Sequence, residues 1–511
     1  MSQINDKPPL ELEDIQGLVR FAHGRLSESA FLLLSIKNTE AAASWLASAP
    51  VTTARPSSPL PTSALQVAFT AQGLAALQVP ENIRQHFSEE FTAGMSGDEN
   101  RSRRLGDTGT NHPGNWHWGE DGNSIHLLLM AYTLPGELTG YLRQLCNHSF
   151  AQAFVVHHNL RAKFTGPQEP FGFVDGISQP TVDWQQTLSS DRHERDSYSN
   201  RLALGEVLLG YPNEYGLYTD RPLVADTVPG AHALPVATDQ PALRDLGRNG
   251  SYLVLRQLAQ DVTGFWQFVE REAGSDTAAK EQLAAHMVGR QRDGKALVNV
   301  SSRPIAGIDA WQQNNHFTFD DDPQGLQCPV GAHIRRANPR TGDYPPGSSG
   351  PLKRLQRTLG FGRRHPNDDV IASARFHRIV RRGRVYGSTL TPEQALRHPP
   401  LKKAREERGL HFVCLGANIS RQFEFIQSAW MMSARFAALS KESDPLLGNR
   451  EPLTSGQITD QFSEPQDGRP ARRIQGLPQF VSVRGGAYFF LPGLRALAFI
   501  LQAHRHLDPD R

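Results

Sequence analysis

Apolar runs followed by amphipathic stretches recur along the chain. There are four such pairs, and they are AFLLLSIKNTEAAASWL (30–46), SIHLLLMAYTLPGELTGYLRQL (124–145), SYLVLRQLAQDVTGFWQFV (251–269) and LHFVCLGANISRQFEFIQSAW (410–430). Continuous apolar runs predict buried strands, and apolar positions spaced three and four apart predict helices packed on them. Strands that alternate with single helices on one side predict an α+β fold of the ferredoxin-like type, and the recurrence of the pattern predicts a duplication.

The order of these patterns divides the chain into two units, 1–245 and 246–511. Each unit is expected to cover one face of an antiparallel sheet with helices and to leave the other face free. The free faces could pack against each other, as in a dimeric α+β barrel-like fold, or enclose a flat apolar ligand. The stretch 165–247 bridges the two units, and 340–369, rich in Gly, Pro and Arg, predicts a long surface loop inserted in the second unit.

The bulk composition excludes several classes of protein. The 511 residues are 38% hydrophobic and 21% charged, with a net charge of +2, so no overall field favours a nucleic acid or an anionic membrane as partner. Three cysteines without a CxxC pair favour a reducing compartment. The first residues lack the pattern of an export signal, and the apolar stretch from 487 is interrupted by Pro492, Gly493 and Arg495, which makes it too short to span a bilayer. We therefore expect a cytoplasmic protein with no membrane partner.

The stretch EPFGFVDGISQP (169–180) places Asp175 among apolar residues and next to a glycine. Aspartate is rarely buried unless it is paired, and burial raises its pKa unless a cation or hydrogen-bond donors oppose the change. Two interpretations are open. The Asp-Gly pair could form a tight turn, or the flexible glycines Gly172 and Gly176 could let the loop bring the carboxylate close to a ligand.

His333, in CPVGAHIRRANPR (328–340), is a candidate metal ligand. A lone histidine is more often a structural residue, and a catalytic zinc requires three protein ligands. The sequence has no HExxH motif and no paired Cys/His cluster. Haem iron requires one proximal protein ligand, so a single histidine fits haem better than zinc.

The arginine-rich stretch FHRIVRRGRVYG (376–387) is predicted to form a strand. The two-residue period turns Arg381 towards the covered face, and it turns Arg378, Arg382 and Arg384 the other way, where some of them are expected to face solvent. An inward arginine needs an anionic partner. A carboxylate, the propionate of a ligand or a plain structural salt bridge would each serve.

Glu424 lies between Phe423 and Phe425 on a predicted helix. A half-buried carboxylate requires a donor, and a histidine that holds a metal commonly gives its other ring proton to such a group. The alternative is an exposed helical glutamate that pairs with Arg421.

In combination these motifs resemble those of the dye-decolorizing peroxidases, haem enzymes with a duplicated ferredoxin-like fold. GFVDG (172–176) is similar to the GxxDG motif of the family, and AHIRRANPR (332–340) falls where the family has its proximal iron ligand. RRGRVYG (381–387) begins at the position of the family's distal arginine. The resemblance extends over essentially the whole chain.

The resemblance implies one haem b per chain, with His333 as the iron ligand. It implies that Asp175 is the distal acid–base residue and that Arg381 stabilises negative charge and contacts the cofactor. Gly172 and Gly176 would border the cofactor, and Glu424 would be the acid that supports His333. The implied partners are hydrogen peroxide and small aromatic, phenolic or dye-like reductants, oxidised by one-electron steps; a homo-oligomer stays open.

An aspartate base predicts activity at acid pH. The ordinary pKa of aspartate is about 3.9 and that of histidine about 6.5, so the carboxylate stays charged where an imidazole base is already protonated. We expect an optimum for substrate oxidation at about pH 4 to 5 from this reference value.

Other functions remain open from the sequence. A haem carrier or storage protein would need His333 but neither Asp175 nor Arg381. An enzyme that removes iron or propionate groups from the porphyrin, or a structural protein without haem, would be further alternatives. If bulky dyes are oxidised at the surface, the candidate aromatic residues are Tyr386, Trp311, Tyr344 and Trp266.

Overall fold

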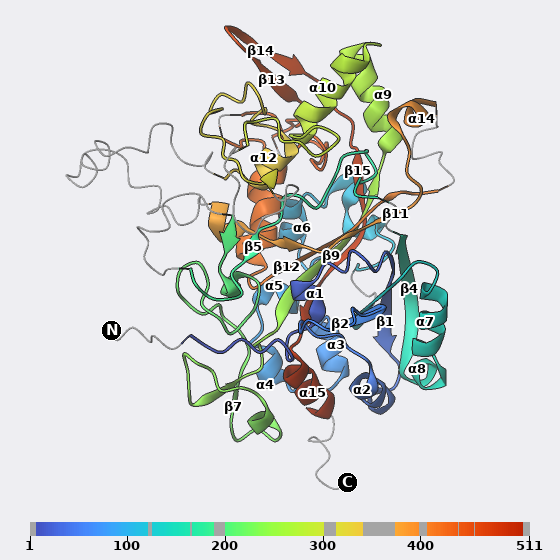
Figure 1. Cartoon of the computed structure of the whole chain (residues 1–511), viewed down its shortest axis with the longest axis vertical. Helices are drawn as coiled ribbons and strands as arrows, with labels where there is room; N and C mark the ends of the chain where they lie inside the picture. Colours follow the sequence, from blue (N-terminus) through green and yellow to red (C-terminus); the bar gives the residue numbers. More distant parts are fainter. Residues whose placement is uncertain are drawn as a thin grey trace, which may run out of the picture.

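A nine-stranded antiparallel sheet forms the centre of the molecule (Figure 1). The computed structural model describes residues 7–120, 125–163, 166–188, 200–300, 313–340, 374–397, 406–437, 439–453 and 455–503. The strands of the sheet are β1 (Glu28–Ile36), β2 (Ser63–Phe69), β3 (Leu127–Thr133), β4 (Phe154–Lys163), β9 (Ser251–Gln260), β10 (Val380–Arg381), β11 (Arg384–Tyr386), β12 (Gly409–Gly416) and β15 (Val481–Leu491).

The strand order contains the same arrangement twice. It runs β10-β12-β9-β15-β2-β3-β1-β4, and β11 also pairs with β12. In each half the order is second, third, first and fourth strand, when β10 and β11 count together as the second strand of their half. This is the order of a ferredoxin-like fold. The halves join where Phe490 of β15 lies opposite Phe69 of β2, so the predicted duplicated α+β fold is confirmed.

All four predicted pairs of strand and helix are present. β1, β3, β9 and β12 are followed by α2 (Thr39–Ser48), α7 (Leu138–Leu145), α9 (Val262–Ala273) and two π-helical segments, η9 (Ser420–Glu424) and η10 (Ile426–Met432). The local sequence fixes where two of these helices begin. The side chain of Asn38 accepts a hydrogen bond from the Ala41 amide, and that of Asp261 accepts one from the Gly264 amide; such caps satisfy amides that have no partner within the helix.

The faces of the two half-sheets that carry no helices pack against each other. Phe31 and Leu33 of β1 belong to the same buried cluster as Leu253 and Leu255 of β9. At the far ends of the sheet β11 lies near β4, yet the described residues form no pairing between these strands. The sheet therefore curls into a barrel-like shape without closing, and the first of the two expected arrangements is the one observed.

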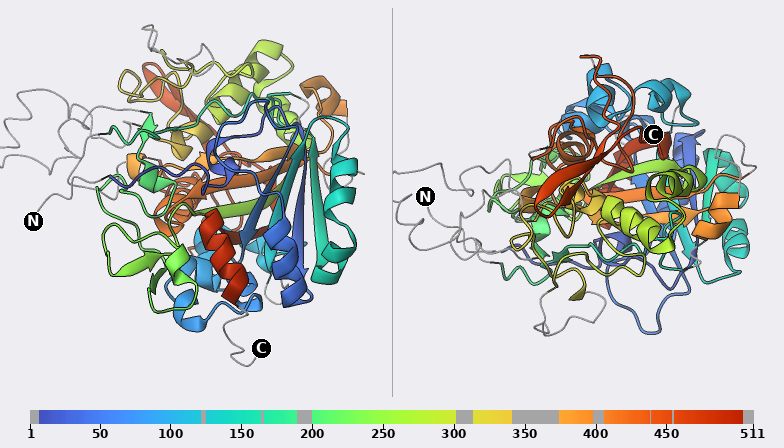
Figure 2. Two further views of the ribbon diagram at one scale, coloured as in Figure 1. Left: turned by 60° about the horizontal axis from the view of Figure 1, so that its bottom comes forward. Right: turned by 90° about the horizontal axis from the view of Figure 1, so that it is seen from above.

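Helices surround the sheet, with α9 and α10 at one end and α2, α4 and α15 at the other (Figures 1 and 2). The remaining α-helices are α1 (Gly17–Arg20), α3 (Ala71–Ala76), α4 (Glu81–Arg84), α5 (Glu89–Ala93), α6 (Glu99–Leu105), α8 (His148–Ala153), α10 (Thr277–Val288), α12 (His333–Ala337), α14 (Pro392–Arg397) and α15 (Leu494–Gln502). Short 3₁₀ turns are η1 (Gly109–Asn111), η2 (Pro113–Asn115), η4 (Leu204–Glu206), η5 (Ala231–Ala233) and η7 (Ala374–His377). Within the described ranges no helix combines the length and the apolar character needed to cross a bilayer.

Among the described residues, three small two-stranded sheets lie outside the central one. They are β5 (Thr181–Val182) with β6 (Arg201–Leu202), β7 (Leu223–Ala225) with β8 (Leu243–Asp245), and β13 (Phe462–Gln466) with β14 (Arg469–Ile474). The first two belong to the bridging segment. The predicted surface loop 340–369 falls almost entirely outside the described residues.

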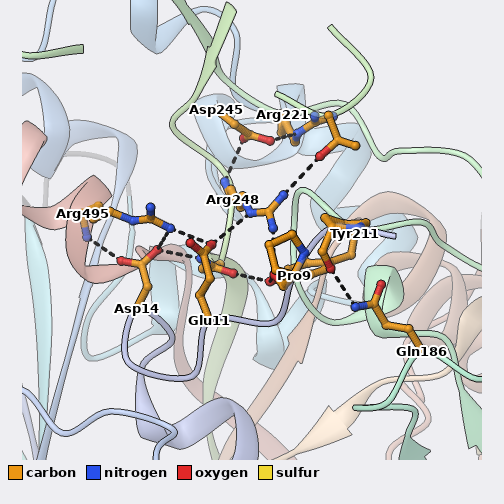
Figure 3. A network of polar contacts seen from close by, with 12 residues as sticks. Pro9, Glu11, Asp14, Gln186, Tyr211, Arg221, Asp245, Arg248 and Arg495 are labelled. Atoms are coloured by element: carbon orange, nitrogen blue, oxygen red, sulfur yellow. Dashed lines mark hydrogen bonds and ion pairs between the residues drawn. The ribbon is translucent and has the colours of Figure 1, made fainter. Parts of the chain in front are cut away.

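A group of charged side chains, which we call the terminal network, ties segments from both ends of the chain to the bridging segment (Figure 3). Arg495 in α15 contacts Glu11 at 2.6 Å and Asp14 at 3.2 Å. Arg248 contacts Glu11 at 3.2 Å, and its backbone amide donates to Asp245 at 2.8 Å. The expected boundary between units at 245 and 246 thus falls inside this network and stays a prediction.

Candidate active site

A cavity opens on the helix-covered face of the second half-sheet. Its apolar wall is formed by Leu258 of β9, Leu410 and Phe412 of β12, and Phe423 and Ile426 of the π-helical segments. The cavity has a volume of about 230 Å³. Because side chains alternate along a strand, this face is opposite to the one buried between the two half-sheets. The cavity therefore does not lie between the free faces of the sheets, where the second expected arrangement would have put it.

Asp175, His333 and Arg381 all line this one cavity. Asp175 comes from the bridging segment, His333 is the first residue of α12, and Arg381 is the last residue of β10. Three residues that are far apart in sequence therefore meet at a single site.

Two glycines shape the loop that carries Asp175. Gly172 has a φ of 97° and Gly176 a φ of 89°, a region that residues with a side chain rarely adopt. A Cβ added to Gly176 would meet no atom within 4 Å, so its backbone conformation, rather than lack of space, requires glycine. The loop is also fixed by the Asp175 amide, which donates to the Pro167 carbonyl at 2.9 Å.

Asp175 and Arg381 form an ion pair inside the cavity. Nη1 of Arg381 donates to Oδ1 of Asp175 at 2.8 Å. The side chain of Gln179 holds the backbone of Arg381, accepting from its amide at 3.1 Å and donating to its carbonyl at 3.0 Å. The Asp175 side chain is 41% exposed, and the exposed part faces the cavity that it lines.

The charge of Arg381 decides the pKa of Asp175. Burial alone raises the pKa of this carboxyl, but the nearby guanidinium, the amide of Gly176 and the ring of His333 lower it below its ordinary value. Asp175 therefore keeps its negative charge to a lower pH than an ordinary aspartate.

The ring of His333 is held by a buried acid, Asp444. Its Nδ1 lies 3.1 and 3.0 Å from the two carboxylate oxygens of Asp444, which is fully buried. Asp444 also accepts hydrogen bonds from the amides of Leu446 at 2.9 Å and Leu447 at 2.7 Å. With Nδ1 occupied, Nε2 is the ring nitrogen left for a ligand in the cavity.

Burial and the ion pair have opposite effects on these two groups. Burial lowers the pKa of His333, but the charge and hydrogen bond of Asp444 raise it, and the net result is a raised pKa. Burial raises the pKa of Asp444, but His333 and the backbone donors bring it below its ordinary value.

The expectation for Glu424 is corrected by this geometry. Its Oε1 lies 2.9 Å from Nε of Arg101 and accepts a hydrogen bond from the Tyr488 hydroxyl at 2.9 Å. The acid beside His333 is Asp444, which lies 111 positions away in sequence. Asp444 precedes a proline in ESDPLLG, a turn-like pattern that gives no sign of so distant a partner.

The expectation that some arginines on the other face of 376–387 face solvent is corrected for Arg378 and Arg384, whereas Arg382 is partly exposed. Arg378 and Arg384 are each only 7% exposed, and Arg384 donates to the carbonyl of His23 at 2.8 Å. Arg382 donates to the carbonyl of Leu18 at 2.7 Å. The N-terminal segment supplies these carbonyls to Arg382 and Arg384, and Arg378 donates to the carbonyl of Arg201 at 3.0 Å. The guanidinium groups therefore bind backbone carbonyls.

Comparison with known proteins decides the family. Dye-decolorizing peroxidase msp1 of Mycetinis scorodonius is 30% identical over 455 residues, which cover 86% of this chain and 77% of that protein. The chain belongs to the dye-decolorizing peroxidase family. Another dye-decolorizing peroxidase, from Auricularia auricula-judae, is 27% identical and covers 87% of this chain and 76% of its own length. No family model matches the chain.

Solved structures show the same fold. A dye-decolorizing peroxidase from Auricularia auricula-judae superimposes with a TM-score of 0.69 over 96% of this chain and 100% of its own, at 24% identity. A dye-decolorizing peroxidase in complex with 2,6-dimethoxyphenol gives a TM-score of 0.69 over 96% and 100% of the chains, at 22% identity. The likeness therefore extends over the whole fold.

As a dye-decolorizing peroxidase, the chain is a haem-dependent oxidoreductase that uses peroxide as electron acceptor. Its cavity fits haem by the chemistry of its walls. Two imidazoles, those of His333 and His377, line a largely apolar space. The ring of His333 is the one held by a buried acid, and one proximal histidine is all that haem iron needs. Among the described residues no group of three or more His, Cys, Asp or Glu is placed to bind a bare metal ion.

Proposed function

We propose that the cavity binds one haem b through Nε2 of His333, and that Asp175 and Arg381 process hydrogen peroxide above it. The observation that carries this proposal is that a histidine oriented by a buried acid and an aspartate paired with an arginine line the same cavity. Bound haem would supply the redox-active iron that accepts the oxidising equivalents of peroxide. Asp444 would fix the tautomer of His333 and make its ring a stronger donor.

In the proposed reaction, Asp175 transfers a proton between the two oxygen atoms of hydrogen peroxide. Its Oδ1 holds Arg381, so Oδ2 is the oxygen available to take a proton from hydrogen peroxide. The same oxygen returns the proton to the departing oxygen atom, which leaves as water. Arg381 stays charged and stabilises the negative charge that develops on that atom, as a preorganised cation in a largely apolar cavity.

The proposed reductants are small aromatic, phenolic or dye-like compounds. A relative from Amycolatopsis, 29% identical over 64% of this chain, is a multifunctional dye peroxidase, and a structural neighbour binds 2,6-dimethoxyphenol. Both proteins support aromatic electron donors for this chain.

For dyes too large to enter the cavity, we propose Tyr386 as the surface oxidation site. It is partly exposed, and its hydroxyl donates at 3.2 Å to the carbonyl of Leu258, a residue of the cavity wall. Trp266 is only 1% exposed, which keeps it from touching a dye. The other two candidates, Trp311 and Tyr344, lie outside the described residues.

A reducing cytoplasm is the proposed location. Cys146, Cys328 and Cys414 are all free thiols, which supports a compartment where disulfides are not maintained. A homo-oligomer stays a prediction.

An absorption spectrum before and after one equivalent of peroxide tests the function. We expect a Soret band that changes when peroxide is added, and an unchanged resting Soret band in Asp175→Asn with a response slowed by about 10²–10⁴. A response of Asp175→Asn as fast as that of the wild type would favour a haem carrier. A pigment whose porphyrin is altered would favour a porphyrin-modifying enzyme, and a colourless protein from haem-supplemented cells would contradict haem binding.

A further inference from the structure

Tyr488 of β15 is buried one ring behind the wall of the haem cavity. Its side chain is 2% exposed. Its ring lies edge-on to that of Phe423, with 6.1 Å between the ring centroids, and Phe423 lines the cavity. The phenol therefore lies close to the proposed haem site but out of reach of dissolved reductants.

The hydroxyl of Tyr488 donates to a carboxylate. The acceptor is Oε1 of Glu424 at 2.9 Å, and Glu424 is itself only 6% exposed. Arg101 lies 2.9 Å and Arg104 3.9 Å from this carboxylate. Burial raises the pKa of Glu424, and Tyr488 and Arg101 only partly offset the rise, so the net pKa is above its ordinary value. A carboxylate with a raised pKa is a stronger proton acceptor than an ordinary glutamate.

Other buried tyrosines have neutral partners. Tyr252 accepts a hydrogen bond from the Ser88 amide at 3.0 Å, and Tyr211 donates to the side-chain oxygen of Asn249 at 2.6 Å. The difference matters for oxidation. A phenol that loses an electron becomes a strong acid, so it is oxidised readily where a base within hydrogen-bond distance takes its proton.

We propose that Tyr488 is an internal oxidation site of the peroxidase and that Glu424 is its proton acceptor, a role that rests on the proposed haem site. In this step the Tyr488 ring gives one electron to the haem centre that peroxide has oxidised. The O–H bond breaks, its proton moves to Oε1 of Glu424, and a neutral tyrosyl radical remains. When a reductant supplies an electron, the proton returns from Glu424 and the phenol is restored.

The environment suits temporary storage of an oxidising equivalent. The proton stays on a neighbouring side chain, so the step is reversible without exchange with solvent. Burial also raises the pKa of Tyr488 well above its ordinary value, so the site holds a neutral phenol until it is oxidised. A radical enclosed in this way is shielded from coupling with a second molecule.

Tyr488→Phe tests the proposal because it removes only the hydroxyl and keeps the packed ring. The protein is loaded with haem, mixed with peroxide without reductant, freeze-quenched and measured by electron paramagnetic resonance. We expect a tyrosyl signal in the wild type that is lost or strongly reduced in Tyr488→Phe. Tyr252→Phe is the matched control, since Tyr252 of β9 is as deeply buried in the same apolar cluster but its hydroxyl is hydrogen-bonded to the Ser88 amide instead of a carboxylate. The signal of this variant should equal that of the wild type.

The outcomes separate this inference from the function on which it rests. A wild type whose Soret band does not respond to peroxide would overturn both. A wild type that responds, with a radical signal of the same amplitude and shape in Tyr488→Phe, would overturn the inference alone.

Glu424→Gln tests the acceptor, because an amide oxygen still accepts the hydrogen bond but takes up no proton at working pH. We expect the tyrosyl signal to form more slowly than in the wild type. An equal rate of formation would contradict the role of Glu424. Since this variant leaves Arg101 without its anion, its thermal unfolding is compared with that of the wild type, and Tyr488→Phe decides the proposal if Glu424→Gln does not fold.

Discussion

The two halves of the sheet share a strand order but use their helix-covered faces in different ways. In the first half, Trp45 of α2 packs edge-on against Phe150 and Phe154, with ring centroids 5.3 and 5.5 Å apart, and fills the space over the strands. In the second half, β12 is followed by a π-helical winding, and a cavity lies between it and the sheet. Both halves have the same scaffold. The half whose helix-covered face is not filled by side chains has the cavity and carries the candidate site.

The chemistry of the site comes mainly from outside the repeated elements. Asp175 lies in the bridging segment, His333 between α10 and β10, and Asp444 between η10 and β13. Of the four groups that shape the site, only Arg381 lies on a strand of the sheet. The comparison therefore separates a repeated frame from added segments that carry its reactive groups.

His333→Ala should have the largest effect, because it removes the proposed iron ligand from the half that has the cavity. We expect no Soret band after supply of haem and no peroxidase activity. The control is His377→Gln, because His377 lines the same cavity with its ring stacked 3.7 Å from that of Phe425. Loss of haem in His377→Gln together with its retention in His333→Ala would reverse the assignment.

Arg381→Leu should lower the rate of reaction with peroxide by about 10²–10³, the usual cost of removing one donor to developing charge. It should also shift the pH profile. In the wild type the rate falls only as the pH drops through the lowered pKa of Asp175. Without the guanidinium, burial dominates and the pKa of Asp175 rises. As the pH is lowered, the variant therefore loses its activity at a higher pH than the wild type does.

The measurement is stopped-flow absorbance over the acid range. Arg381→Lys keeps the positive charge and should retain an acid limb closer to that of the wild type. An acid limb at the same pH in Arg381→Leu would show that Arg381 does not control Asp175.

Asp444→Asn should weaken haem binding by about 10- to 100-fold, as expected for loss of an acid that orients a metal ligand. Glu424→Gln should leave the affinity unchanged, since Glu424 contacts Arg101 and Tyr488 instead. Competition for haem with apo-myoglobin measures both. Equal affinities in the two variants would show that the pairing with Asp444 does not matter for haem.

Trp45→Ala should have the smallest effect on the site, although it removes a large side chain from the core of the first half. We expect a loss of about 3–5 kcal/mol in the free energy of unfolding and an unchanged Soret band and rate with peroxide. Denaturant unfolding and absorption spectra check this pair of results. A shifted Soret band would show that packing in the first half reaches the haem site.

The sequence predicts the frame well because its signals are local. Apolar runs and helical spacing locate strands and helices such as β1 with α2 and β9 with α9. The combination of GFVDG, AHIRRANPR and RRGRVYG selected three residues that the structure brings to one cavity. Each of these signals lies within a short window.

What the sequence does not predict depends on distant contacts. The phenylalanines beside Glu424 correctly indicate burial, but its partner Arg101 lies more than three hundred positions earlier. Alternation correctly assigns Arg384 to the face opposite Arg381, but not the carbonyl of His23 that it binds. Sequence periodicity predicts the direction in which a side chain points, but its contacts depend on the tertiary structure.

The terminal network has a consequence for how the molecule is made. Arg495 and Asp14 are separated by 481 positions, and α15 lies beside α2 of the first half (Figure 2). Contacts of such sequence separation form late and slow the search for the native state. During synthesis the first half would keep one flank uncovered until α15 has been made, so the two halves complete their folding together rather than one after the other.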